Sequence, residues 1–148
     1  MKERHMKSGY TKYLESLIRD LDLVENVVFL GSLNEYQIVK ELQNVDVTVI
    51  PSFVETYCLA FAESMMIGTP TIASYAGAMP ELAEDSEDAS FYNSMDFISC
   101  AYYIDQLVCD KSLAEKFSAN GRGKRLLEND RETVLQTQLE IYKTLIQS

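Results

Sequence analysis

Short apolar segments alternate with helix-period segments along this sequence as far as Tyr92, and this alternation is its strongest constraint on the fold. The apolar segments are rich in β-branched and aromatic residues and are bounded by turn residues, which is typical of buried strands. Strands without a polar side need cover on both faces, so the sequence predicts an α/β fold with a parallel sheet flanked by helices. The expected strands are Val27–Leu30, Val45–Ile50, Thr71–Ala73 and Ala89–Tyr92.

Apolar residues recur at helical spacing between these strands and after them. Asn34 is a plausible N-cap for the second helix, and Gly68 followed by Pro70 is expected to end the third. Gly121–Gly123 predicts an interruption of the fifth helix, with Lys124 and Arg125 on a solvated face. The expected helices are Tyr10–Leu21, Glu35–Asn44, Leu59–Ile67, Phe97–Val108, Ser112–Leu127 and Arg131–Ile146.

Length and charge limit the function. A chain of 148 residues can bury one core, so we expect one domain over residues 1–148, with residues 1–9 flexible and residues 131–148 forming a C-terminal helix. The net charge of −10 argues against nucleic acid as a partner, because that affinity depends on Lys and Arg. The N-terminal residues are charged and no apolar run approaches roughly 18 residues, so neither a signal peptide nor a membrane-spanning helix is expected.

The cysteines bear on the compartment. Cys58, Cys100 and Cys109 are odd in number and lack a CxxC spacing. They lie in apolar, helical surroundings, which predicts buried thiols in a reducing compartment, and therefore a cytoplasmic protein.

Two glutamates mark the candidate site. Ligands of open parallel sheets bind beyond the carboxyl ends of the strands, and Glu55 lies in the loop after Ile50 while Glu63 lies in the next helix. Both can reach a ligand along the first two helical turns, which rise about 11 Å. The helix start suits an anionic diphosphate, and a carboxylate suits vicinal hydroxyls. The residues alone also permit two solvated surface glutamates.

The acidic loop Ala83–Asp88 offers a second cluster of carboxylates, from Glu84, Asp85, Glu87 and Asp88. We interpret it as a solvated turn in preference to a metal site.

The residues around the two glutamates form a longer pattern. It consists of Pro51-Ser52, Glu55, Glu63, Gly68-Thr69-Pro70, a strand ending at Ala73-Ser74, and Gly77-Ala78-Met79-Pro80-Glu81. This pattern resembles the signature of the large retaining glycosyltransferase family that includes sucrose synthase and bacterial capsule and lipopolysaccharide enzymes (glycosyl transferases group 1, family 4 type). The segment Asn26–Gly31 and the terminal helices also resemble that family, so the likeness covers nearly the whole chain. It implies the Rossmann-like C-terminal domain of the GT-B fold.

The resemblance implies a role for each residue of the site. Glu55 would be the catalytic residue that contacts the donor sugar hydroxyls and helps to align the anomeric carbon, and Glu63 would hold the ribose hydroxyls. A hexose would pass with retention from a nucleotide-diphosphate sugar to an acceptor hydroxyl, with leaving-group charge met by fixed hydrogen-bond donors and no metal or other cofactor required. The other implied donor-binding residues are Thr56, Tyr57, Cys58, Leu59, Gly31 and Ser32.

The sequence departs from the family in several places. The family commonly has small residues where Tyr57 and Cys58 stand, and Ala78 replaces a Gly. The first two strands of the family's domain, with an Arg and a Lys for the diphosphate, are absent, as is the N-terminal acceptor domain. We therefore expect a chain that is inactive alone and a sheet that is broken, rearranged or completed by another chain, with self-association through unpaired strands. Exposure of Leu139, Tyr142 and Leu145 is also expected.

Two alternatives stay open. One is a non-catalytic nucleotide- or sugar-binding module. The other is a flavodoxin-like or response-regulator-like signalling domain, whose phosphorylatable Asp should end the first strand, where Gly31 stands. The family resemblance implies polysaccharide synthesis for the cell envelope or capsule, at the cytoplasmic face of the membrane, with peripheral membrane association of the full protein.

Overall fold

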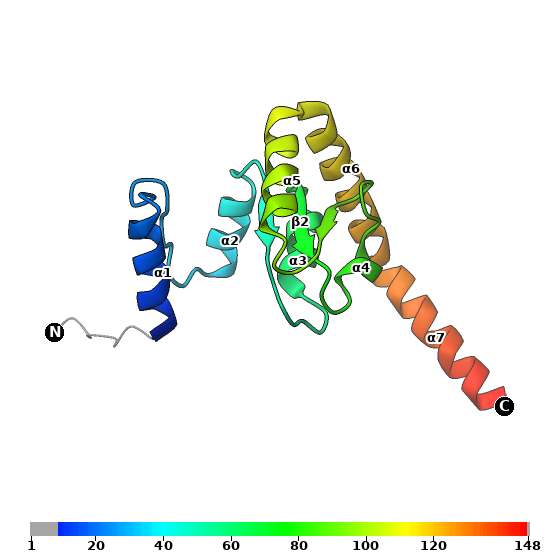
Figure 1. Cartoon of the computed structure of the whole chain (residues 1–148). Coiled ribbons are helices and arrows are strands. Elements are labelled where there is room, and N and C mark those ends of the chain that lie inside the picture. Colours follow the sequence, from blue (N-terminus) through cyan, green and yellow to red (C-terminus); the bar gives the residue numbers. More distant parts are fainter. Residues whose placement is uncertain (1–8, 148) are drawn as a thin grey trace. The chain divides into compact units, whose positions relative to one another are not determined.

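The computed structural model of the chain describes residues 9–147 (Figure 1). Contacts divide the chain into two compact units, one ending at Asn34 and the other beginning at Glu35. The first unit contains α1 (Gly9–Asp20), which confirms the expected helix. The Leu23 N–H donates to the Ile18 carbonyl (2.9 Å) just beyond its end. The expected flexibility of residues 1–9 falls outside the described residues, except at Gly9.

The second unit contains the remaining helices and the sheet. The strands are parallel and lie in the order β1-β2-β3, with Val49 opposite Ile72 and Ile72 opposite Ser90. The predicted α/β class, a parallel sheet flanked by helices, is confirmed. The elements are α2 (Glu35–Leu42), β1 (Thr48–Ile50), α3 (Leu59–Ile67), β2 (Thr71–Ser74), α4 (Met79–Leu82), β3 (Ser90–Tyr92), α5 (Phe97–Cys109), α6 (Lys111–Glu128) and α7 (Arg131–Gln147).

Helices cover both faces of the sheet, because successive side chains of a strand point to opposite sides. Ala73 of β2 belongs to a buried cluster with Phe61 of α3. Its neighbour Ile72 belongs to a second cluster with Leu107 of α5 and Phe117 of α6. All four residues of β2 are buried, which explains why this strand has no polar side. Figure 1 shows the strands between α3 and α5.

The helix α3 has the bounds that the sequence predicts. Gly68 ends it in the left-handed region (φ 94°), and its N–H donates to the carbonyls of Ser64 and Met65. Such a C-cap favours glycine, since it has no Cβ to clash. The next residue, Thr69, is buried and its hydroxyl donates to the Leu42 carbonyl (2.6 Å), which ties the end of α2 to the end of α3.

The buried strand expected at Val27–Leu30 is wrong. These residues join no ladder in the described part of the chain, and Val28, Phe29 and Leu30 are 76%, 58% and 55% exposed. A strand needs a neighbouring backbone for its hydrogen bonds, and none of the described strands provides one here. We expected a sheet that is broken, rearranged or completed by another chain. Within the described residues, three of the four expected strands form one sheet and the fourth stays outside it.

Two interpretations of α6 are also wrong. The helix runs without interruption through Gly121–Gly123, and Gly121 is buried. Arg125 is 1% exposed, because its guanidinium is enclosed and pairs with the Glu128 carboxylate one turn later. Lys124 is half-buried and forms an ion pair with Asp88 (3.0 Å). Arg125 therefore belongs to the interior, and Lys124 lies at its border.

The three thiols lie in different environments. Cys58 is buried and Cys100 half-buried, whereas Cys109 is exposed and donates to the Asp105 carboxylate (3.7 Å). The prediction of buried thiols is therefore wrong for Cys109, which lies on the outer face of α5.

The last helix, α7, has no buried residue. Leu139, Tyr142 and Leu145 are 40%, 60% and 66% exposed, as expected from the sequence. Among residues 9–147, no helix combines the length and the apolar character needed to cross a bilayer.

Candidate donor site at the carboxyl ends of the strands

The loop after β1 is fastened by the other two strands. The Ser52 carbonyl accepts a hydrogen bond from the hydroxyl of Ser74, the last residue of β2, and another from Ser94 (3.5 Å), just after β3. The carboxyl ends of parallel strands meet at one edge of the sheet, so these hydroxyls converge on one carbonyl. The loop that carries Glu55 is therefore held in place by the scaffold.

The turn after β2 packs directly on this loop. Gly77 has φ +55°, and a Cβ built there would lie 2.5 Å from the Glu55 carbonyl oxygen and 2.7 Å from that of Thr56. The following Ala78 N–H donates to the Thr56 carbonyl (2.9 Å). Only glycine allows this approach, because any side chain at residue 77 would overlap the backbone that carries Glu55.

The Glu55 side chain is half-buried and oriented. The Ser52 hydroxyl donates to Glu55 Oε1 (2.8 Å), which leaves the carboxylate with further acceptor capacity. The residues that position Glu55 are Ser52, Ser74, Gly77 and Ser94. Sequence reasoning listed the first three as family-signature residues without this role and missed Ser94. Their common signal is a serine or glycine at the end of a strand or within three residues of it.

The start of α3 lies between the two glutamates in sequence. Its N-cap, Cys58, is in the left-handed region (φ 65°), a conformation that residues other than Gly, Asn and Asp rarely adopt. Burial raises the pKa of the Cys58 thiol, and the nearby Glu55 carboxylate adds to the rise. The thiol is therefore a neutral packing group beside the glutamate. Tyr57 and Leu59 on either side are exposed.

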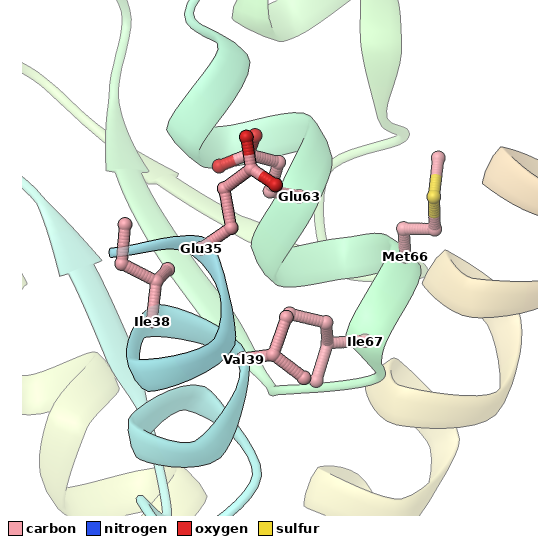
Figure 2. A pocket seen from close by; sticks show the side chains of 6 residues that line it. All are labelled: Glu35, Ile38, Val39, Glu63, Met66 and Ile67. Carbon is pink, nitrogen blue, oxygen red and sulfur yellow. The ribbon is translucent and has the colours of Figure 1, made fainter. Parts of the chain in front are cut away.

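Glu63 is exposed on α3 and lines a hollow of about 260 Å³ between α2 and α3 (Figure 2). Glu55 is not among the residues that line it. The sequence suggested that both glutamates serve one ligand. In the structure Glu55 lies in the loop before α3 and Glu63 lies on α3 facing α2, so the two do not line the same hollow. The hollow is lined by Glu35, Ile38, Val39, Glu63, Met66 and Ile67.

Gly31 and Ser32, the expected neighbours of the base, lie in the first unit. Gly31 has φ +73°, which agrees with its prediction as a turn residue. Both residues are exposed and follow Val27–Leu30, which joins no sheet in the described part of the chain.

Two carboxylates of the acidic loop accept hydrogen bonds from nearby backbone N–H groups. Asp85 accepts from the Phe91 N–H (2.9 Å) and the Tyr75 hydroxyl (3.2 Å). Asp88 accepts from the Glu84 N–H (3.0 Å) and pairs with Lys124. Asp88 is buried, so it is not the solvated residue that the sequence suggested. Within residues 9–147, no group of three or more His, Cys, Asp or Glu side chains is placed to hold a metal ion.

Comparison with known proteins decides the family. The family described as "Glycosyl transferases group 1" matches residues 7–124. The chain belongs to this family.

Relatives within the glycosyltransferase family are moderately similar. An uncharacterized glycosyltransferase of Methanocaldococcus jannaschii is 27% identical over 131 residues, which is 88% of this chain and 34% of the relative. The MMP alpha-(1->4)-mannosyltransferase of Mycolicibacterium hassiacum is 27% identical over 89% of this chain and 32% of its own length. The chain thus spans about a third of these relatives.

Solved glycosyltransferase structures share the fold. Sucrose-phosphate synthase of Thermosynechococcus elongatus has a TM-score of 0.83 at 23% identity, over 98% of this chain and 36% of that one. The C-terminal domain of a group 1 glycosyltransferase (LpcC) of Francisella tularensis has a TM-score of 0.72 at 26% identity, over 81% and 62%. HepE of Anabaena, solved with UDP, has a TM-score of 0.83 at 23% identity, over 91% and 37%. These neighbours are GT-B glycosyltransferases.

Proposed function

We propose that this chain is the donor-binding portion of a retaining hexosyltransferase and that it binds a nucleotide-diphosphate sugar. The observation that carries the proposal is the loop after β1, where Ser52, Ser74 and Gly77 fix a half-buried Glu55 just before α3. Membership of the family supports it, as does the structure of HepE with UDP-glucose.

Each residue then has a task. Glu55 accepts hydrogen bonds from the donor sugar hydroxyls and helps to align the anomeric carbon, and Glu63 accepts those of the ribose hydroxyls. The start of a helix has positive dipole character and suits an anion, so the backbone of Thr56–Leu59, which leads into α3, can meet the diphosphate. Fixed hydrogen-bond donors stabilise the leaving diphosphate, and no metal is invoked.

The whole protein would need more than this chain. In our proposal an acceptor-binding domain completes the enzyme, which transfers the sugar to an acceptor hydroxyl in cell-envelope or capsule polysaccharide synthesis. We place it in the cytoplasm, at the inner face of the membrane. The length relative to its relatives supports the need for a further domain.

Calorimetric titration of the chain with UDP, GDP, ADP and CDP, and with the glucose derivatives of those that bind, tests donor binding. Glu63→Gln should weaken the binding of nucleotides and of nucleotide sugars by a similar factor, about tenfold, because it removes a charged acceptor. Glu55→Gln should weaken the binding of the sugar-bearing ligands only. Glu41→Gln, an exposed change on α2, is the matched control. Absence of any nucleotide binding by the unsubstituted chain would exclude the proposal.

The alternative is a non-catalytic module, in which Glu55 and Glu63 bind the ligand but no sugar is transferred. Fusing the chain to the N-terminal half of the Mycolicibacterium relative and measuring nucleotide release separates the two. Turnover that is lost with Glu55→Gln supports the transferase, whereas binding without turnover supports the module.

A further inference from the structure

The hollow between α2 and α3 has two different ends. Figure 2 shows the carboxylates of Glu35 and Glu63 at one end, from two helices, while Val39 and Ile67 project toward one another at the other. Ile38 and Met66 complete the apolar lining. A ligand that fits this space has apolar faces and hydrogen-bond donors on one edge.

The two helices that line the hollow are tied together at one end. The buried Thr69 hydroxyl donates to the Leu42 carbonyl (2.6 Å), which ties the last turn of α2 to the end of α3. Glu35 begins α2 and Glu63 lies in the middle of α3, so the separation of the two carboxylates follows from the packing of the helices.

The size of the hollow permits a ring system. Its volume of about 260 Å³ is the space of eight or nine water molecules at ~30 Å³ each. Ionised carboxylates only accept hydrogen bonds, so the ligand must present donors to both Glu35 and Glu63.

We propose that Glu35 selects the base of the donor nucleotide. This inference rests on the proposed function, in which Glu63 holds the ribose hydroxyls. The base then lies over the apolar lining and an N–H on its edge donates to the Glu35 carboxylate. All ribonucleotides carry the ribose hydroxyls that Glu63 would hold, whereas the pattern of N–H donors differs between bases. Glu35 is therefore a specificity residue, and Glu63 is not.

Glu35 could instead have a purely structural role, which is to compensate the dipole of α2 from its first turn. That role affects the stability of α2 and would not make the affinity depend on the base. Discrimination between bases is thus a readout that a structural role does not change.

The test measures the dissociation constants of UDP, GDP, ADP and CDP for the unsubstituted chain and for Glu35→Gln, Glu63→Gln and Glu41→Gln. We expect Glu35→Gln to weaken the binding of the preferred nucleotide about tenfold or more, because a charged acceptor is lost, and to bring its dissociation constant closer to those of the other three. Glu63→Gln should weaken the binding of all four nucleotides alike, and Glu41→Gln should change none of the four constants. Thermal unfolding of each variant confirms that it is folded.

The outcomes separate the two proposals. If Glu35→Gln leaves the four constants unchanged or weakens them all equally, the role in base selection is overturned while donor binding stands. If Glu63→Gln has no effect but Glu35→Gln alters the ranking, the ribose role of Glu63 fails and base selection holds. If the unsubstituted chain binds no nucleotide, both proposals are overturned.

Discussion

At Gly77 a single missing side chain decides whether the loop of Glu55 can keep its position. The residue combines φ +55° with a Cβ direction that points at the carbonyls of Glu55 and Thr56, 2.5 and 2.7 Å away. Gly77→Ala should therefore lower the free energy of unfolding by about 2 kcal/mol or more, because the backbone must shift or take up strain. Urea denaturation measures this change, and the proposed donor affinity should fall with it.

Gly123→Ala is the matched control for Gly77→Ala. A Cβ at Gly123 would meet nothing within 4 Å, and its helical position favours alanine. This variant should be as stable as the unsubstituted chain or more so. Equal behaviour of the two variants would show that the contact between the Gly77 turn and the Glu55 loop is unimportant.

The raised pKa of Tyr92 leads us to expect a loss of stability in alkali. Burial raises the pKa of its hydroxyl from 10.0 to about 12, and a hydrogen bond with Cys100 adds to the rise. Between these two values the unfolded chain has lost this proton and the folded chain still holds it, so the folded state loses stability as the pH rises from about 10 towards about 12. Urea denaturation over this range should show a shallower decline for Tyr92→Phe. An identical pH dependence in both proteins would contradict the assignment.

The candidate site could be predicted at the level of single residues but not of their neighbours. Glu55 and Glu63 stand out because their spacing and flanking residues form a local pattern. The contact of Gly77 with Glu55 joins two loops distant in sequence, and the facing of Glu35 and Glu63 depends on how α2 packs against α3. Such contacts arise from tertiary packing, which no local pattern records.

At the scale of elements, the contact between α3 and α6 depends on Gly121. A Cβ there would lie 3.2 Å from Met65 Cε and 3.3 Å from the Asp88 carbonyl oxygen, so the two segments meet where α6 has no side chain. Gly121→Val should lower the free energy of unfolding by about 1–3 kcal/mol through overpacking. Chemical denaturation measures it. Gly123→Val, two residues along in open space, should cost less, and a larger loss there would refute this account of the interface.

Helix and strand positions were predictable where termination signals are local. The bounds of α3 follow from Gly68 and Pro70, and α5 and α6 begin within one residue of the expected positions. Val27–Leu30 was misjudged because its apolar composition indicates a strand without indicating a partner. Gly121 was misjudged because a glycine in the sequence can indicate either a helix break or a close contact between helices. Arg125 was misjudged since burial of a cation depends on Glu128 and its packing.

At the scale of the whole molecule, the described residues leave two apolar surfaces uncovered. One is Val27–Leu30, and the other is the α7 surface, in which Tyr142, Leu145 and Ile146 are 60%, 66% and 84% exposed. Monomeric soluble proteins rarely expose large contiguous apolar patches, and unpaired extended segments readily add to other strands. Neither surface is used by the proposed donor site, so both are available to bind another domain or another copy of the chain.

We expect the isolated chain to self-associate through Val27–Leu30, because this segment offers apolar side chains and joins none of the described strands. Light scattering coupled to size-exclusion chromatography should give a mass above 16.8 kDa, which Val28→Lys with Leu30→Lys should return to the monomer value. Leu145→Lys with Ile146→Lys is the comparison on α7, where side chains are exposed but the backbone is satisfied within the helix. This pair should reduce binding of a hydrophobic dye and leave the mass unchanged. If instead the α7 pair alone restores the monomer, association occurs between helices, and an unsubstituted chain that is monomeric at all concentrations excludes association through either surface.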